Sequence, residues 1–129
     1  GRFLDVMASI LRLDVDALDT EAAKATAPAA ISSTCTVFAE SEVISQLANG
    51  VKRPDLVAGI CRSVASRVAA LARRAGVTEQ VCLSGGVARN DAVRQALSEE
   101  LNVPVSVDPL AQYFGAIGAA LWAHKEVSK

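Results

Sequence analysis

Aromatic residues are scarce in this sequence, so small and branched side chains must form most of its core. Phe, Tyr and Trp together make up 4% of the 129 residues, whereas 51% of the residues are hydrophobic. Alanine and valine supply much of that apolar content, which predicts elements that pack closely. A chain of this length is sufficient for one domain with one core.

The sequence also lacks an excess of charge of either sign. It has 13 Lys and Arg residues against 14 Asp and Glu residues, a formal net charge of −1. Without a basic surplus, the chain has little to attract a phosphate backbone, which argues against nucleic acid as its main partner. No apolar run is long enough to cross a bilayer and no signal-peptide pattern opens the sequence, so we expect no membrane partner.

Cysteine is rare and is not spaced for a disulfide framework or a zinc site. The sequence has three cysteines, Cys35, Cys61 and Cys82, an odd number at wide spacing with no C-x-x-C pair. A reducing, cytoplasmic location is therefore expected. Because Cys61 and Cys82 lie in apolar stretches and match no ligand pattern, we predict that both are buried core thiols.

Hydrophobic periodicity predicts a helix-rich chain with two short strands. The helical patterns cover residues 3–11, 15–22, 39–47, 54–75, 91–101 and 112–124, and the strand patterns cover residues 80–83 and 103–107. Strand, helix and strand in this order predict a parallel βαβ unit with a right-handed crossover. Two parallel strands are too few to stand alone, and the first helix starts without a cap of its own, so we expect further strands from a longer protein.

The longest predicted helix, residues 54–75, has two distinct faces. Its apolar stripe is expected to pack in the core and contains Val57, Ile60, Val64, Val68 and Leu71. Arginines lie mostly off this stripe, at positions 62, 67, 73 and 74. They are typical of a solvated helix face, and the alternative is that one of them lines a nucleotide pocket.

Residues 83–90 read LSGGVARN and lie where the first strand ends and a helix begins. Ligands of parallel sheets bind at this edge. Gly85 and Gly86 let a ring or a phosphate approach bare backbone, and the following helix N-terminus offers N–H donors. An ordinary strand-to-helix turn uses glycines in the same way, so the spacing alone does not choose between a binding loop and a plain turn.

Residues 31–42 read ISSTCTVFAESE and place Cys35 among hydroxyl residues just before a helical pattern. We predict a loop or short extended piece through Phe38, with Glu40 and Glu42 complementing the helix dipole. Hydroxyls and a helix N-terminus both favour an anionic sulfur, as thiolate or metal-bound. Composition alone favours the other interpretation, a buried structural thiol beside a helix cap.

Several of these segments resemble one superfamily and, within it, one family. Residues 83–90 resemble the adenosine motif of the sugar kinase, actin and heat-shock chaperone ATPase superfamily, and residues 112–121 resemble its small-residue helix near the hinge. Residues 1–5 (GRFLD) and 33–42 are similar to the ATP-dependent activators of 2-hydroxyacyl-CoA dehydratases, a family that includes the benzoyl-CoA reductase ATPase subunits (BadF/BadG/BcrA/BcrD type). The resemblance covers essentially the whole chain.

The resemblance implies an α/β fold, the C-terminal portion of an actin-like (ribonuclease H-like) ATPase domain that is helix-rich with a short parallel βαβ unit. Residues 1–129 would form a single subdomain, with a helical insertion carrying the cysteine at about 14–52 and the adenosine-motif βαβ and closing helix at about 77–125. ATP or ADP with Mg²⁺ is the implied nucleotide. Its adenine site would include Gly85, Gly86, Val87 and Asn90.

The resemblance further implies a homodimer that holds one [4Fe–4S] cluster, for which Cys35 matches one of two ligand positions in each copy. The second ligand, the phosphate loops and the magnesium-binding acids are expected ahead of Gly1, so the chain by itself should not hydrolyse ATP efficiently. The family passes one low-potential electron to a 2-hydroxyacyl-CoA dehydratase or benzoyl-CoA reductase component. Ferredoxin or flavodoxin would be the donor. The sequence identifies no catalytic residues.

Two alternatives remain from the sequence. A sugar or small-acid kinase of the same superfamily would share the LSGGVARN turn but would have no use for Cys35. A non-catalytic dimerisation module is the third interpretation.

Overall fold

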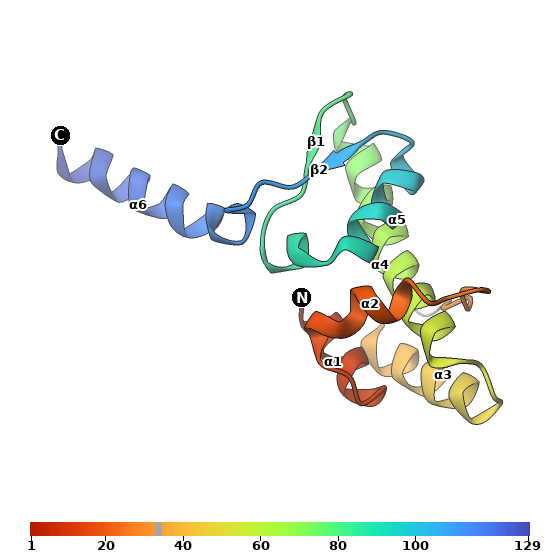
Figure 1. Cartoon of the computed structure of the whole chain (residues 1–129). Helices are drawn as coiled ribbons and strands as arrows, with labels where there is room; N and C mark the ends of the chain where they lie inside the picture. Colours follow the sequence, from red (N-terminus) through yellow and green to blue (C-terminus); the bar gives the residue numbers. More distant parts are fainter. Residues whose placement is uncertain (33–34) are drawn as a thin grey trace.

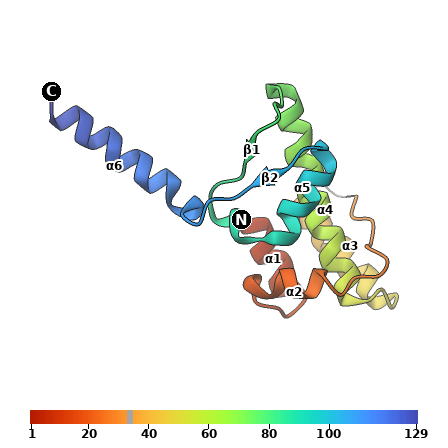
Figure 2. The same ribbon diagram turned by 45° about the horizontal axis from the view of Figure 1, so that its top comes forward.

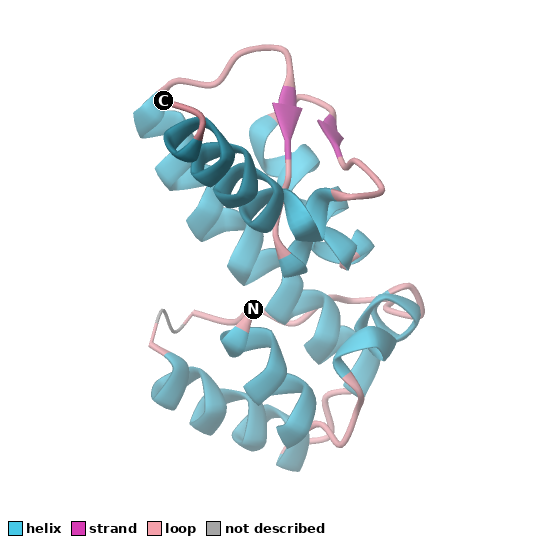
Figure 3. Ribbon diagram, turned by 90° about the vertical axis from the view of Figure 1, so that its left-hand side faces the viewer, coloured by secondary structure: helices cyan, strands magenta, loops and turns pink. Residues whose placement is uncertain are grey.

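The computed structural model describes residues 1–32 and 35–129, which fold into a helical cluster, a βαβ unit and a protruding last helix (Figure 1). The strands lie at the end of the molecule away from the helical cluster (Figure 3). The helical cluster and the βαβ unit are joined by one long helix, α4 (Arg53–Ala75). Within the described residues, no helix has the length and apolar character needed to cross a membrane.

The helical cluster surrounds the first half of α4. It contains the helices α1 (Arg2–Ile10), η1 (Val15–Ala17), α2 (Leu18–Ala22) and α3 (Thr36–Ala48). Its buried side chains come from the positions with helical spacing, and the largest are Met7, Leu18, Val43, Leu56, Val57 and Ile60. Of these, Val57 and Ile60 belong to the apolar stripe that the sequence predicted for α4, whereas Leu56 does not.

Helix α3 begins earlier than the sequence pattern predicted. Cys35 is extended, with φ −89° and ψ 135°, and its carbonyl accepts the Ala39 N–H at 2.9 Å. This bond starts the helix at Thr36, so the prediction of a loop through Phe38 was wrong. The first turn consequently contains no acidic residue, and Glu42 instead accepts hydrogen bonds from the Ser32 N–H and hydroxyl.

The apolar stripe of α4 is covered over only part of its length. Val57 and Ile60 are buried as expected, whereas Val68 and Leu71 are 39% and 64% exposed. In this second half the buried positions are instead Ala65 and Ala69, which belong to the same core as Ala96 and Leu97 of α5 (Asp91–Leu101). Two alanines let α5 lie close to α4, because short side chains leave little between the two helices.

The predicted βαβ unit is present, with shorter strands than expected. Strands β1 (Val81–Cys82) and β2 (Val105–Ser106) are parallel, with Val81 opposite Val105, and α5 connects them. Val81 and Leu83 are half-buried and pack against the α4–α5 core, so the residue between them faces the other side of the strand. Cys82 is therefore exposed, and the prediction that it is a buried thiol was wrong.

Cys61 behaves as predicted. It lies on α4 among the buried residues of the helical cluster, with 1% of its surface exposed. The same apolar sequence setting thus gave one buried and one exposed cysteine. The two cysteines differ because of the elements that carry them. A helix inside a cluster can have a face that is completely covered by its neighbours, whereas the lone two-stranded sheet is covered on only one of its two faces.

Helix α6 (Phe114–Val127) follows η3 (Ala111–Tyr113) and projects from the rest of the molecule (Figure 2). None of its residues is buried. A Cβ added at Gly115 or Gly118 would meet no atom within 4 Å. Among the described residues, therefore, no neighbouring backbone approaches its small side chains.

Candidate functional site

The turn after β1 uses its two glycines for different reasons. Gly85 has φ +88°, a conformation that other residues rarely adopt, and its N–H donates to the Ala111 carbonyl at 2.9 Å. Gly86 opens the short helix η2 (Gly86–Arg89), and a Cβ there would meet nothing within 4 Å. Gly85 therefore shapes the turn, and Gly86 leaves bare backbone facing open space.

Asn90 caps the helix that follows this turn. Its side-chain oxygen accepts the Val93 N–H at 2.8 Å, and the residue is buried with 8% of its surface exposed. The cap commits this oxygen to α5, so the side-chain NH₂ is the group it can offer to a ligand. The sequence marked Asn90 as a binding residue, and the structure adds a structural role.

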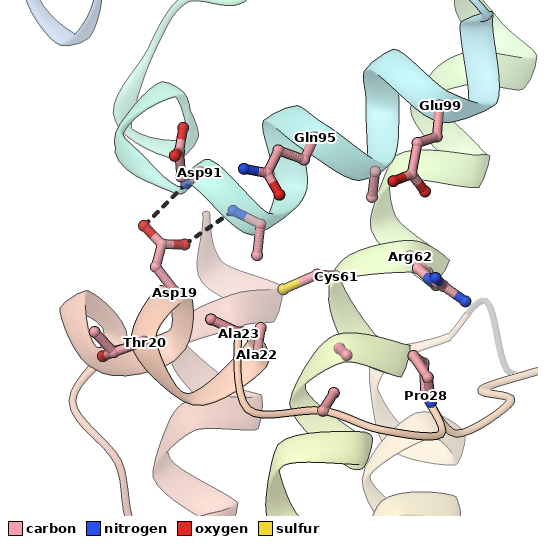
Figure 4. Close-up of a pocket in the computed structure, with 14 residues that line it drawn as sticks. Asp19, Thr20, Ala22, Ala23, Pro28, Cys61, Arg62, Asp91, Gln95 and Glu99 are labelled. Carbon is pink, nitrogen blue, oxygen red and sulfur yellow. Dashed lines mark hydrogen bonds between the residues drawn. The ribbon is translucent and has the colours of Figure 1, made fainter.

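The N-terminus of α5 does not offer free donors as expected. The N–H groups of Asp91 and Ala92 donate to the two carboxylate oxygens of Asp19, at 2.9 and 3.1 Å (Figure 4). Asp19 belongs to α2, far back in the sequence, and its charge suits the positive end of the α5 dipole. The expectation that this helix end would donate to a ligand was therefore wrong.

A cavity of about 380 Å³ gathers most of the predicted nucleotide residues. Gly86, Val87 and Asn90 line one wall, whereas Gly85 does not line the cavity. Arg89 of the same motif also lines the cavity. The remaining lining comes from the start of the chain, from η1 and α2, and from η3: Gly1, Leu4, Asp5, Val15, Asp16, Asp19 and Gln112. The LSGGVARN turn and the helical cluster thus line the same cavity.

The charges of this cavity favour an uncharged polar ligand group. Three carboxylates line it, those of Asp5, Asp16 and Asp19, against one cation, Arg89. Arg89 pairs with Asp16 at 3.7 Å across the cavity. Carboxylates accept hydrogen bonds from N–H and O–H groups and repel phosphates, so the lining suits a base or sugar better than a phosphate chain.

Arg89 and the three aspartates were not singled out as site residues from the sequence. Arg89 lies within the LSGGVARN motif, so its proximity to the turn was visible, whereas the aspartates lie 67 or more positions before Gly86 in the sequence. The arginines of α4, which the sequence offered as possible pocket residues, do not line this cavity. Arg67 lies over the Phe3 ring at 4.6 Å and Arg73 pairs with Glu100 at 3.8 Å.

A second cleft of about 390 Å³ lies on the other side of Asp19, between α2, α4 and α5 (Figure 4). Small apolar residues and Cys61 line its inner part, and Arg62 and Glu99 stand at its edge. Burial, together with the nearby charge of Asp19, raises the pKa of Cys61 to about 12. The thiol therefore stays protonated at neutral pH and is a poor nucleophile.

Cys35 is exposed and lies at the N-cap of α3, where its side chain makes no capping hydrogen bond. Ser33 and Thr34 of the same motif lie outside the described residues. Within residues 1–32 and 35–129, no group of three or more His, Cys, Asp or Glu could hold a metal ion. The Cys35 side chain is thus accessible, and the described residues do not by themselves form a metal site around it.

The strap (residues 26–32) that leads to Cys35 is fastened to α4. The buried carboxylate of Asp55 accepts the Thr26 and Ala27 N–H groups, both at 2.9 Å, and the Asp55 carbonyl accepts the Ala29 N–H at 2.9 Å. A Cβ at Gly59 would overlap the Ala29 carbonyl oxygen. The strap backbone thus lies directly on α4, which a larger residue at position 59 would prevent.

Comparison with known proteins identifies the family. Residues 1–123 match the BadF/BadG/BcrA/BcrD ATPase family. The chain belongs to this family. The family assignment agrees with the resemblance carried by residues 1–5, 33–42 and 83–90.

Named relatives are similar to the chain over its whole length. It is 59% identical over 129 residues to the (R)-2-hydroxyglutaryl-CoA dehydratase activating ATPase of Acidaminococcus fermentans and 49% identical over 129 residues to the 2-hydroxyisocaproyl-CoA dehydratase activator of Clostridioides difficile. It is 34% identical over 128 residues to one of the subunits of the benzoyl-CoA reductase of Thauera aromatica. These matches cover 100%, 100% and 95% of this chain but 50%, 48% and 45% of the relatives, so the chain spans about half their length.

Solved structures of such activators have the same fold. The crystal structure of component A of the A. fermentans (R)-2-hydroxyglutaryl-CoA dehydratase superposes with a TM-score of 0.93 at 59% identity and covers 100% of this chain and 50% of its own. The activator of the Clostridium difficile 2-hydroxyisocaproyl-CoA dehydratase with bound ADPNP gives a TM-score of 0.92 at 49% identity, covering 99% and 48%. The helix-rich fold with its short parallel sheet therefore matches about half of each activator structure.

Proposed function

We propose that the chain is the C-terminal part of an ATP-hydrolysing iron–sulfur activator that passes a low-potential electron to a 2-hydroxyacyl-CoA dehydratase. The observation that carries the proposal is 59% identity over the full chain to an activating ATPase of this kind. In this proposal the fold belongs to an actin-like (ribonuclease H-like) ATPase domain. Residues 14–52 form its helical insertion, and residues 77–125 form the adenosine-motif βαβ unit and closing helix.

The cavity beside the LSGGVARN turn would take the adenine and ribose of ATP or ADP. Gly86 and Val87 would supply a flat backbone wall, Gly85 would hold the turn, and the Asn90 NH₂ would donate to the ligand. The carboxylates of Asp5 and Asp16 would accept from the amino group or the ribose hydroxyls, and the negative charge of the lining would direct the phosphates away. The ADPNP bound to the C. difficile activator supports a nucleotide site in this fold.

Cys35 would contribute one thiolate to a [4Fe–4S] cluster shared by two copies of the protein. The bound cluster would supply one-electron transfer at low potential. Cys35 is exposed at the N-cap of α3, and the neighbouring Val37 and Phe38, 66% and 69% exposed, offer an apolar rim that a second copy could cover. A homodimer is therefore part of the proposal.

The partner would be a 2-hydroxyacyl-CoA dehydratase, with a benzoyl-CoA reductase component as the second candidate because one relative is part of that reductase. A ferredoxin or flavodoxin in the cytoplasm would supply the electron. The sugar or small-acid kinase is the weaker alternative, since the relatives described above are activators and a reductase component.

The cluster proposal is tested by anaerobic iron–sulfur reconstitution of the full-length protein, with Cys35→Ala as the variant and Cys82→Ala as the matched control. Both cysteines are exposed, so each substitution removes an accessible thiol. The visible absorption and the electron paramagnetic resonance signal of the reduced cluster should disappear in Cys35→Ala and persist in Cys82→Ala. An unchanged cluster spectrum in Cys35→Ala would exclude the ligand role.

A further inference from the structure

The first turn of α5 is capped by a carboxylate from a distant part of the chain. Asp19, on α2, lies 72 residues before Asp91 and accepts its N–H at 2.9 Å through one oxygen, while the other oxygen accepts the Ala92 N–H at 3.1 Å (Figure 4). Asn90 satisfies the third donor, the Val93 N–H. None of the ion pairs found among the described residues includes Asp19. The positive end of α5 is therefore what compensates its charge.

The LSGGVARN turn is tied to this capped end. The Asn90 N–H donates to the Val87 carbonyl at 2.9 Å, and the Ala88 N–H donates to the Gly85 carbonyl at 3.1 Å. These short-range bonds make residues 85–90 continuous with the first turn of α5. Whatever holds that turn also holds the backbone wall of the cavity.

Asp19 also belongs to the opposite wall of the cavity, which the helical cluster supplies. Its two hydrogen bonds are thus direct links between the two walls. The Asp16–Arg89 pair crosses the same gap at 3.7 Å, but its side chains are 73% and 62% exposed, and such pairs contribute little. Asp19 is the stronger of these links, because both of its oxygens are bonded to backbone at a helix end.

We propose that Asp19 is a positioning residue of the nucleotide site, which sets the spacing of the two cavity walls by holding α2 against α5. The inference rests on the proposed function, in which this cavity takes adenine and ribose. Asp19 acts through the backbone of the turn and makes no contact with phosphate.

The test compares Asp19→Ala and Asp19→Asn with the control Asp14→Asn in the full-length protein. Asp14 is exposed, makes no side-chain capping bond and does not line the cavity, so it controls for removal of one negative charge nearby. Dissociation constants for adenosine, ADP and ATP are measured by calorimetry. Hydrogen exchange of the Asp91 and Ala92 amides reports the cap directly.

Asp19→Ala should weaken adenosine, ADP and ATP by the same factor, about tenfold, which corresponds to roughly one charge-assisted hydrogen bond. Asp19→Asn should weaken them less, because its remaining oxygen still accepts one N–H and its size is nearly unchanged. Both variants should speed exchange of the Asp91 and Ala92 amides. Asp14→Asn should match the wild type in affinity and exchange.

Two results would overturn this inference but leave the proposed nucleotide site standing. Unchanged nucleotide affinity in both Asp19 variants, with faster amide exchange, would make Asp19 a purely structural cap. A loss that grows from adenosine to ATP, or tighter ATP binding in Asp19→Ala, would show that Asp19 acts on the phosphates. Wild-type protein that binds none of the three ligands would overturn the proposed nucleotide site itself, and the inference with it.

Discussion

Substitution of Gly59 by alanine tests whether the strap leading to Cys35 lies directly on α4. Gly59 is in the interior of α4, where alanine is ordinarily better than glycine by about 1 kcal/mol. Here the new Cβ would overlap the Ala29 carbonyl oxygen, which is backbone and cannot turn aside. Overpacking of this kind costs about 1–3 kcal/mol.

The strap would have to move to relieve the overlap, and its movement would strain the bond from the Ala29 N–H to the Asp55 carbonyl. Loss of one such bond costs about 1 kcal/mol. The lost hydrogen bond (about 1 kcal/mol) and a middle overpacking cost (about 2 kcal/mol) together exceed the gain in helix propensity (about 1 kcal/mol). The expected net destabilisation is therefore about 2 kcal/mol. The free energy of unfolding, measured by urea denaturation, should fall by this amount.

The control is Ala70→Gly, at an exposed position in the interior of the same helix. It changes the helix propensity alone and should destabilise by about 1 kcal/mol. Hydrogen exchange at the Ala29 amide should accelerate in Gly59→Ala and stay unchanged in the control. A Gly59→Ala protein that is more stable than the wild type, with normal exchange at Ala29, would refute the direct contact.

Two further predictions concern ionisable groups. Hydrogen bonds from Lys24 and Arg53 lower the pKa of Glu21 below its usual 4.5, so its carboxylate stabilises the fold above pH 4.5 and this contribution is lost as the pH falls through the lowered value. Measured by urea unfolding from pH 7 to pH 3, the free energy of unfolding should fall more steeply in the wild type than in Glu21→Gln. Parallel curves for the two proteins would contradict this. Burial and the charge of Asp19 raise the pKa of the Cys61 thiol to about 12. Thiol titration at pH 8 should therefore count equal numbers of reactive thiols in native wild type and native Cys61→Ala. After unfolding, the wild type should show one more reactive thiol than Cys61→Ala. A native wild-type count above that of Cys61→Ala would show that the thiol is accessible.

The elements of this fold were predictable where the signal is local. Helical periodicity identified α1, α3, α4 and α5, and two short apolar runs gave the parallel strands in the correct order. The start of α3 was missed because Thr36, Val37 and Phe38 have side chains that favour a strand. The carbonyl of Cys35 overrides that preference by accepting the Ala39 N–H.

Exposure was less predictable than secondary structure, because it depends on which neighbours are present. Cys61 and Cys82 both sit in apolar sequence, yet one is buried on a helix inside a cluster and the other lies on the open face of a two-stranded sheet. The same limit applies to Val68 and Leu71 at the far end of α4. A periodic pattern shows which side chains share a face but does not show what covers that face.

The candidate nucleotide site was half predictable for a related reason. Gly86, Val87 and Asn90 lie within the five residues 86–90, so a motif could mark them, whereas the wall formed by Asp5, Asp16 and Asp19 comes from a separate part of the chain. In the sequence Asp19 lies in the first turn of α2 and would be assigned to the dipole of its own helix. In the fold its carboxylate accepts hydrogen bonds from α5. The hydrophobic periodicity of α2 and of α5 cannot predict such a pair, because its donor and acceptor lie 72 residues apart. The helix end that a motif offers to a ligand can therefore already be occupied, and only the packing of α2 against α5 shows this.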